Sequence, residues 1–243
     1  MANNTAQTTA QTADDKVIVK DYFNATGFDR WRRIYGDGEV NKVQLDIRQG
    51  HQQTVDTVLA WLEDDGNLGQ LTVCDAGCGV GSLSIPLAQA GATVYASDIS
   101  EKMVGEAQER YGQLSNSSGS APLGSAEFKV SDLETLSGRY HTVICLDVLI
   151  HYPQQQALEM LNHLSSLAEA RLIVSFAPKT LAYSLLKKIG DFFPGPSKAT
   201  RAYLHREAEI VRFLEANGWK IERSAMTKTR FYFSRLLEAM KSP

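Results

Sequence analysis

Apolar residues recur along the chain with two spacings that alternate. Short runs rich in valine, isoleucine and leucine are typical of buried strands, whereas apolar positions three or four residues apart are typical of helices. Val55, Val58, Leu59 and Leu62, for example, fall on one face of a helix. The pattern predicts strands at residues 71–74, 93–97, 126–130, 142–146, 172–176, 219–227 and 230–236, and helices at 50–64, 82–89, 101–111, 155–167 and 206–218.

The order of these elements predicts an α/β fold of Rossmann-like type. Strands that alternate with helices form a parallel sheet whose two faces are covered by helices. The last two strands lie too close together for a crossover helix, so we expect them to be antiparallel at one edge of the sheet. The polar, glycine-containing stretch that begins at Ser115 predicts a flexible surface loop.

Composition narrows the class of protein. The 25 basic and 28 acidic residues nearly cancel, so the charge gives no reason to expect a nucleic-acid partner. No apolar run approaches the roughly 18 residues of a membrane span. Residues 1–15 are polar, without a basic start or an apolar core, and predict a disordered tail rather than a secretory signal. The lack of arginine in this tail argues against an organelle transit peptide.

Three cysteines, without an extracellular signature, favour reduced thiols and a cytoplasmic location. Cys74 and Cys78 are four residues apart, a spacing that raises the question of a metal site. However, Cys74 lies on a predicted buried strand and Cys145 lies inside another apolar run. We therefore interpret the cysteines as small buried residues and predict no metal site.

A glycine-rich segment gives the clearest chemical signal. Gly77, Gly79 and Gly81 form a G-x-G-x-G pattern, and a serine stands where the dinucleotide fingerprint has its third glycine. Asp75, at the end of the preceding strand, would repel a pyrophosphate and suits a ligand that is positively charged at that point. Asp98, at the end of the next strand, is placed to accept hydrogen bonds from both ribose hydroxyls.

These features favour an adenosyl ligand with a cationic tail over a nicotinamide dinucleotide. S-adenosylmethionine carries an ammonium and a sulfonium and has no phosphate. The segments VCDAGCGVGSL and YASDIS resemble the class I S-adenosylmethionine-dependent methyltransferases, over about residues 54–176. The resemblance implies a seven-stranded sheet with an antiparallel last strand. Under the methionine part it implies Gly77, Cys78 and Gly79, with Asp75 ordering the loop and Gly81 completing the glycine pattern. It places Asp98 at the ribose, Ile99 and Met103 beside the adenine, and Asp132 and Leu133 at the adenine edge. Leu146 and Asp147 are expected to face the methionine and the substrate.

Three of these assignments have structural alternatives. Asp132 also suits a cap for the turn in SDLE. Met103 suits the core as well as it suits an adenine wall. Asp147 follows an apolar run and also suits a solvated strand end, although an acid there belongs at the ligand-binding edge of such a sheet.

The substrate must be inferred from the segments outside that region. The stretch NATGFDRWRRIYGDGEVNKVQLDIRQGHQQTV resembles the N-terminal region of the magnesium-protoporphyrin IX O-methyltransferases of chlorophyll synthesis, and LIHYP and RFYFSRLLE fit that family as well. The resemblance implies methylation of a propionate of magnesium-protoporphyrin IX to the monomethyl ester, with magnesium present only as part of the substrate. It also implies a contact with the porphyrin-carrying subunit of magnesium chelatase.

Two segments are expected to cover the active site of a methyltransferase domain at residues 51–243. The first is an N-terminal arm at residues 16–50, and the second is a cap inserted at about residues 178–205. Both mix aromatic with basic residues, which suits the flat walls and anionic propionates of a porphyrin. The alternative for each is an amphipathic helix with solvated charges, and the cap also suits a peripheral contact with the surface of a photosynthetic membrane.

A propionate is already ionised at neutral pH, so its methylation needs no strong base. Tyr35 is predicted to align the carboxylate by a hydrogen bond. His151 is predicted to accept a stray proton or to coordinate the substrate's magnesium, with a structural turn residue as the alternative. His51 is expected to start a helix. His141, His163 and His205 are expected at the surface.

Other functions stay open at this point. A methyltransferase of the same fold could act on a quinone precursor or an amine. A binding protein could hold S-adenosylmethionine or a tetrapyrrole without turnover, although the intact loop, Asp98 and the covering segments disfavour it. A nicotinamide oxidoreductase is disfavoured by Asp75 and by the register of the glycines.

Overall fold

The computed structural model describes residues 17–117, 123–179 and 203–242. Within them, seven strands form one sheet in the order β3-β2-β1-β4-β5-β7-β6. The first five strands are parallel, and β7 runs antiparallel to both β5 and β6. The predicted seven-stranded α/β class is confirmed. The strands are β1 Thr72–Ala76, β2 Thr93–Asp98, β3 Ser125–Val130, β4 Tyr140–Cys145, β5 Ala168–Phe176, β6 Trp219–Lys228 and β7 Phe233–Lys241.

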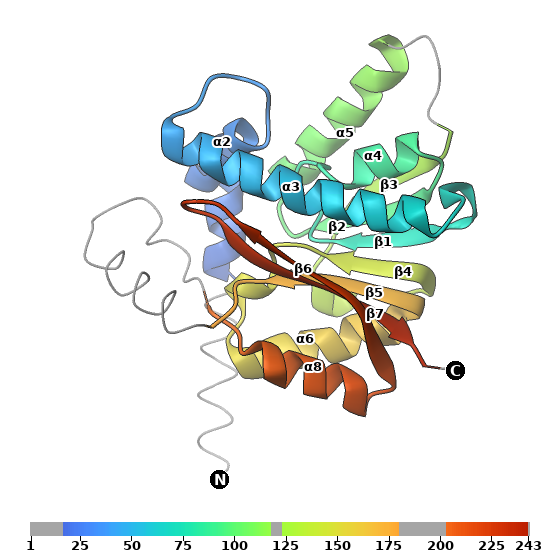
Figure 1. Cartoon of the computed structure of the whole chain (residues 1–243). Helices are drawn as coiled ribbons and strands as arrows, with labels where there is room; N and C mark the ends of the chain where they lie inside the picture. Colours follow the sequence, from blue (N-terminus) through green and yellow to red (C-terminus); the bar gives the residue numbers. More distant parts are fainter. Residues whose placement is uncertain (1–16, 118–122, 180–202, 243) are drawn as a thin grey trace.

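Helices cover both faces of the sheet (Figure 1). On one face α3, α4 and α5 bury a core that includes Val58 and Leu87, and on the other α6 and α8 bury Leu161 and Ile210. The cores are apolar because the strands between them present side chains to two covered faces. The helices are α2 Thr26–Ile34, α3 Lys42–Asp64, α4 Ser84–Gln89, α5 Glu101–Ser117, α6 Gln154–Leu167 and α8 Glu207–Ala216, with residues 17–24 also helical and 3-10 turns at η1 Leu68–Gln70, η2 Leu133–Thr135 and η3 Leu149–His151.

Several element boundaries differ from the prediction, and the starts of α3 and β7 have a clear local cause. Helix α3 begins at Lys42 rather than at residue 50, because Asn41 and Gln44 form a reciprocal capping box at its start. The boundary expected between arm and domain, at residues 50 and 51, therefore falls inside one continuous helix. Strand β7 starts later than predicted, because the N–H of Thr229 donates to the carbonyl of Tyr232 across a turn, at 2.9 Å.

Other expectations fall partly or wholly beyond the described ranges. Helix α5 extends to Ser117 and so takes up the first residues of the predicted surface loop. The tail at residues 1–15, the loop at 118–122 and the cap at 180–202 lie outside the described residues. The three cysteines are buried free thiols, as predicted. None of the helices in the described ranges has the length and apolar character required to traverse a lipid bilayer.

His205 was expected at the surface, and that prediction is wrong. Its side chain is fully buried, and its Nε2 lies 2.8 Å from the carbonyl oxygen of Leu149. An isolated bridge pairs His205 with Pro178, and the N–H of Lys179 donates to the carbonyl of His205. Residues 177–179 and His205 are thus joined by backbone hydrogen bonds, and we call this contact the clasp. His205 is buried because it is part of the clasp.

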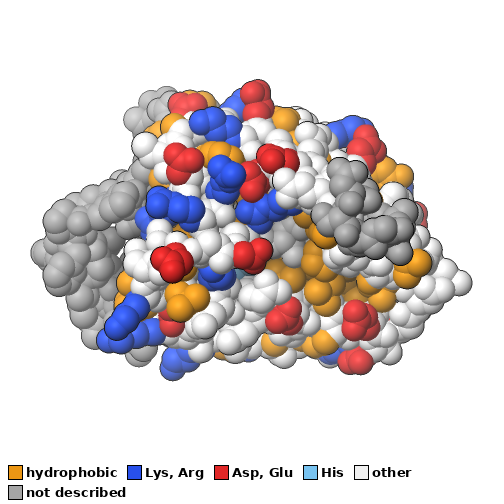
Figure 2. Space-filling model, turned by 90° about the horizontal axis from the view of Figure 1, so that it is seen from above, with side chains coloured by type: hydrophobic (Ala, Val, Ile, Leu, Met, Phe, Trp, Pro, Cys, Tyr) orange, Lys and Arg blue, Asp and Glu red, His pale blue; other side chains and the backbone are white. Residues whose placement is uncertain are grey.

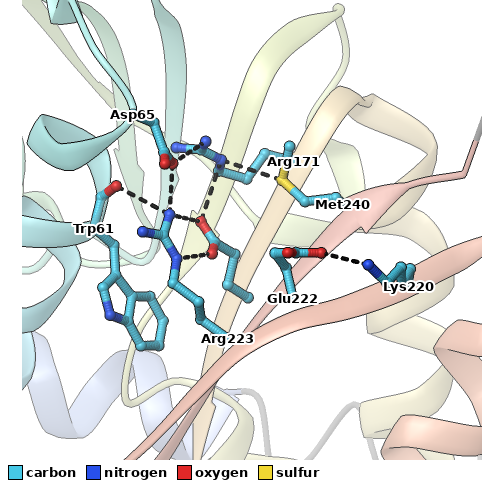
Figure 3. Close-up of polar contacts among 8 residues, drawn as sticks. Trp61, Asp65, Arg171, Lys220, Glu222, Arg223 and Met240 are labelled. Atoms are coloured by element: carbon cyan, nitrogen blue, oxygen red, sulfur yellow. Dashed lines mark hydrogen bonds and ion pairs between the residues drawn. The ribbon is translucent and has the colours of Figure 1, made fainter.

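A buried ionic network joins the antiparallel edge of the sheet to the end of α3 (Figure 3). Glu238 on β7 is fully buried and forms ion pairs with Arg223 on β6 and Arg171 on β5. Both guanidinium groups also contact Asp65 Oδ2, each at 2.5 Å. Two cations thus face two carboxylates, which compensates the charge that burial of Glu238 removes from water.

Candidate active site

A cavity opens at the carboxyl ends of β1, β2 and β4 and is closed on one side by the N-terminal arm. Its empty volume is about 1010 Å³, open solvent at the mouth included. Val19 and Phe23 of the arm line it, together with many of the predicted site residues. These are Tyr35, Gly77, Cys78, Gly79, Asp98, Ile99, Met103, Leu133, Leu146, Asp147 and His151.

The glycine loop is shaped for close packing rather than for phosphate. Gly77 has φ +90°, and a Cβ there would lie 2.2 Å from Cγ2 of Val148. The N–H groups of Gly77 and Cys78 both donate to the carbonyl of Ser97, at 2.8 and 2.9 Å. The N–H of Gly79 donates to Asp98 Oδ2 at 3.0 Å. None of these three donors is left for a pyrophosphate, so the loop does not suit a dinucleotide.

Asp98 is held so that both of its oxygens stay available to a ligand. Oδ2 accepts from Gly79 and Oδ1 accepts from the N–H of Ser100 at 2.9 Å, and each carboxylate oxygen can accept a further hydrogen bond. Burial raises the pKa of this carboxyl, although the backbone donors oppose the shift. The geometry suits a pair of ribose hydroxyls, and Ile99 and Met103 line the cavity beside it.

Three predicted cofactor residues do not line the cavity. Asp75 is buried and accepts a hydrogen bond from the hydroxyl of Ser84, so it lies where it can order the loop. Gly81 has φ +82°, and its N–H donates to the carbonyl of Cys78. Asp132 Oδ1 accepts from the N–H of Glu134 at 3.1 Å, the geometry of the capping alternative.

The buried carboxyl of Asp75 makes stability depend on pH. Burial raises its pKa to about 6 from 3.8, despite the hydrogen bond from Ser84. The folded state therefore binds this proton more tightly than the unfolded state does. The contribution of this proton to the stability of the fold is fully present below pH 3.8 and is lost as the pH rises through 6. We expect the stability of Asp75→Asn relative to the natural chain to increase over this window, by about 3 kcal/mol in total. Urea unfolding from pH 4 to 8 measures this difference, and a constant difference would contradict it.

Tyr35 lies at the end of α2, with its ring 5.4 Å from that of Trp31 and 4.4 Å from that of His51. Burial, reinforced by the negative charges of Asp147 and Asp98, raises the pKa of its phenol well above the usual value. The phenol is therefore protonated at neutral pH and available as a hydrogen-bond donor. The guanidinium of Arg110 on α5 donates to the carbonyl of Tyr35 at 2.7 Å and fixes its backbone.

The arginines beside Tyr35 are engaged with the protein. Arg32 pairs with Glu106 at 2.9 Å, and Arg33 Nε donates to the carbonyl of Asp29. The Arg30 guanidinium lies 5.7 Å from the ring of Trp31. Figure 2 shows basic and acidic side chains alternating on this side of the molecule, so the arm does not present an uninterrupted basic surface.

His151 ends the turn η3 at the rim of the same cavity. Burial lowers its pKa to about 4, although the nearby charge of Asp147 opposes the shift. The imidazole is therefore neutral at pH 7, and its buried Nδ1 has no hydrogen-bond partner among the described residues. The ring of Phe23 contacts it edge-on at 5.7 Å. Such a nitrogen is a poor base but a suitable hydrogen-bonding group or metal ligand.

Comparison with known proteins decides the family. A model described as "Magnesium-protoporphyrin IX methyltransferase C-terminus" matches residues 145–241, and one described as "Methyltransferase domain" matches residues 73–170. The curated magnesium-protoporphyrin O-methyltransferase of Synechocystis sp. PCC 6803 is 66% identical over 94% of this chain and 97% of its own length. The chain belongs to the magnesium-protoporphyrin O-methyltransferase family.

Solved structures of this family agree with the fold. A crystal structure of the Synechocystis PCC 6803 methyltransferase with bound S-adenosylhomocysteine superposes with a TM-score of 0.85, at 64% identity over 93% of this chain and all of that one. Another, with bound S-adenosylmethionine, gives a TM-score of 0.81 at 59% identity, over 94% of this chain and 97% of that one. The predicted family and methyl donor are thereby confirmed.

Two residues of the site, His51 and Tyr232, are not among the site residues predicted from the sequence. His51 lies within α3, not at its start, and its Nδ1 is 2.9 Å from Asp147 Oδ2. The hydroxyl of Tyr232, in the turn between β6 and β7, lies 2.8 Å from the same oxygen. A local signal for Tyr232 is Gly50, which lies inside α3, because a glycine inside a helix usually has a packing reason.

Proposed function

We propose that this chain transfers a methyl group from S-adenosylmethionine to a propionate carboxylate of magnesium-protoporphyrin IX and forms the monomethyl ester. The observation that carries the proposal is the similarity to the named Synechocystis methyltransferase across nearly the whole of both chains. The cavity supports it, because its loop suits an adenosyl group without phosphate and its rim carries a protonated phenol and a neutral imidazole.

In the proposed complex, bound S-adenosylmethionine supplies a methyl group activated by the sulfonium. Asp98 accepts hydrogen bonds from the ribose hydroxyls, and Ile99 and Met103 flank the adenine. The closely packed backbone of Gly77, Cys78 and Gly79 lies beneath the methionine part. Each of these roles rests on the position of the residue in the cavity lining.

The chain contributes alignment rather than acid–base chemistry to the reaction. A propionate is a carboxylate at neutral pH, so the attacking oxygen already has its lone pair free. The protonated phenol of Tyr35 donates a hydrogen bond to the second carboxylate oxygen and orients the first. Holding nucleophile and methyl group in line supplies most of the rate enhancement. Val19, Phe23 and Leu146 give the cavity apolar walls that exclude water.

His151 is proposed to recognise the metal of the substrate. Because its pKa is low, the imidazole is unsuited to taking a proton at pH 7. Of the two roles predicted for it, coordination of magnesium is therefore favoured over acceptance of a proton. The unpartnered Nδ1 is the nitrogen that would meet the magnesium or a water bound to it. Removal of magnesium from the substrate should then weaken its binding in the natural chain more than in His151→Ala.

The proposed function is tested by incubating the chain with S-adenosylmethionine and magnesium-protoporphyrin IX. A monomethyl ester detected by mass spectrometry supports it. Metal-free protoporphyrin and a phenolic quinone precursor are assayed in parallel, for comparison with magnesium-protoporphyrin IX. Preferential methylation of the phenol would replace the proposal with the quinone alternative.

Tyr35→Phe and His151→Ala are expected to lower kcat roughly tenfold or more, because each removes a group that orients the substrate. Neither change should alter the affinity for S-adenosylhomocysteine by more than about twofold. Steady-state kinetics and calorimetry measure the two effects. Gln52→Ala, an exposed position on α3 whose side chain donates to Asp56, is the matched control. An unchanged kcat in either variant would show that the residue replaced there does not orient the substrate.

Two further contacts are proposals, of which the contact with magnesium chelatase rests on the family resemblance and the membrane contact on the composition of the cap. Transfer of the porphyrin from the carrier subunit of magnesium chelatase predicts that the two proteins co-purify when loaded with substrate. The membrane contact is proposed for the cap, of which residues 180–202 lie outside the described residues. Flotation with anionic vesicles tests that contact.

A further inference from the structure

Asp147 is the centre of a buried polar network beside the cavity. It has a positive φ of 57°, a conformation that costs energy in a residue other than glycine. Its N–H donates to the hydroxyl oxygen of Ser175 at 2.8 Å, and that hydroxyl in turn donates to Asp147 Oδ1 at 3.0 Å. The hydroxyl of Ser234 lies 3.3 Å from the same oxygen. The carboxylate is therefore fixed from β5 and β7 at once.

The hydroxyl of Tyr232 lies within hydrogen-bond distance of both oxygens of this carboxylate, 3.0 Å from Oδ1 and 2.8 Å from Oδ2, and its ring depends on a glycine in α3. A Cβ at Gly50 would lie 2.4 Å from Cδ1 of Tyr232, so only glycine allows the ring to lie against the helix. Burial and the charge of Asp147 raise the pKa of the Tyr232 phenol well above its usual value, which keeps it a donor. A glycine inside a helix costs about 1 kcal/mol, and here it makes room for a contact to Asp147.

His51 connects the network to the cavity. Burial would raise the pKa of Asp147, but hydrogen bonds from His51, Tyr232 and Ser175 hold it below its ordinary value. Asp147 is therefore an acceptor only, and the proton of the hydrogen bond lies on Nδ1 of His51. This bond fixes the plane of the imidazole, whose ring lies 4.4 Å from that of Tyr35. His51 and Tyr35 both line the cavity, whereas Tyr232 does not.

We infer that His51 and Tyr232 are positioning residues for the methyl transfer and act through Tyr35. Tyr232 holds Asp147, Asp147 holds the imidazole of His51, and the imidazole holds the phenol of Tyr35 at the substrate. The inference rests on the proposed function, in which Tyr35 aligns the propionate. It explains why four side chains, from α3, β5, β7 and the turn before β7, converge on one carboxylate that faces the cavity.

A double-mutant cycle tests the inference. Tyr232→Phe removes a single oxygen atom, and His51→Asn keeps a donor for Asp147 while it removes the ring that contacts Tyr35. Each change should lower kcat roughly fivefold or more with unchanged affinity for S-adenosylhomocysteine. In the Tyr35→Phe background the same changes should lower kcat less than about twofold, because the group that they position is already absent. Gln52→Ala is again the control.

A second measurement does not depend on turnover. With 3-fluorotyrosine incorporated, the resonance that disappears in Tyr35→Phe reports the environment of Tyr35. We expect it to shift or broaden in His51→Asn and Tyr232→Phe and to stay unchanged in Gln52→Ala. An unchanged resonance, additive losses of kcat in the cycle, or full kcat in both single variants would each overturn the inference. An inactive natural chain with the expected spectral changes would refute the proposed function instead.

Discussion

Replacing Asp98 with alanine is expected to weaken the binding of S-adenosylmethionine roughly tenfold or more while the chain stays folded. Hydrogen bonds from two ribose hydroxyls to a charged acceptor contribute roughly 1.5–3 kcal/mol each at most. The change also frees the N–H of Gly79, which now donates to the carboxylate, and so loosens the loop beneath the ligand. Isothermal titration calorimetry measures the loss directly.

Two further variants separate the ribose contact from a general effect of charge or folding. Asp98→Asn keeps one carbonyl oxygen and should lose less affinity than Asp98→Ala. Asp56→Ala removes an exposed aspartate from α3 and should leave the affinity unchanged. Unchanged affinity in Asp98→Ala, with unfolding in urea like that of the natural chain, would refute the ribose assignment.

Glu238→Gln is expected to lower the free energy of unfolding by about 3 kcal/mol, the lower end for breaking a buried ion pair. The amide has nearly the shape of the carboxylate, but it removes the buried negative charge between Arg171 and Arg223 and directs N–H groups toward guanidinium donors. Asp65 still faces both arginines and limits the loss. Urea denaturation at neutral pH measures the change.

The matched control for this stability effect lies on the neighbouring strand. Glu222 pairs with Lys220 at 2.9 Å, but both side chains are about half exposed or more. Glu222→Gln should change the free energy of unfolding by less than about 0.5 kcal/mol. Equal effects at positions 222 and 238 would show that burial does not set the strength of the Glu238 network.

The fold was predictable because its signal is local and repeated. Each strand of the parallel part is an apolar run of the expected length, and the glycine loop follows β1 where a ligand-binding loop of such a sheet belongs. The start of α3 was also encoded locally, in Asn41 and Gln44, but the apolar face on which the helix prediction rested begins only further along the helix. Polar caps carry no periodicity, so a method based on hydrophobic spacing begins the helix too late.

The interactions of the histidines were not predictable from local sequence. His51 and Asp147 are 96 positions apart, and only the packing of α3 across the end of β4 brings them together. His205 is a polar residue in a polar neighbourhood of the sequence, yet it is buried because its backbone bridges to Pro178 and its ring contacts Leu149. Long-range pairing of this kind requires the tertiary arrangement. The roles assigned to Tyr35, His151 and the cofactor residues stay predictions until the variants are measured.

The clasp between residues 177–179 and His205 has a consequence for how the family can diversify. Its backbone hydrogen bonds hold together the two points between which residues 180–202 are inserted. Once the ends of an insertion are fixed, doubling its length changes the entropy of loop closure by only about 0.6 kcal/mol. As far as loop closure is concerned, descendants of this chain can therefore lengthen or shorten the insertion at little cost, and the fixed ends let the segment vary while its two attachment points stay in place.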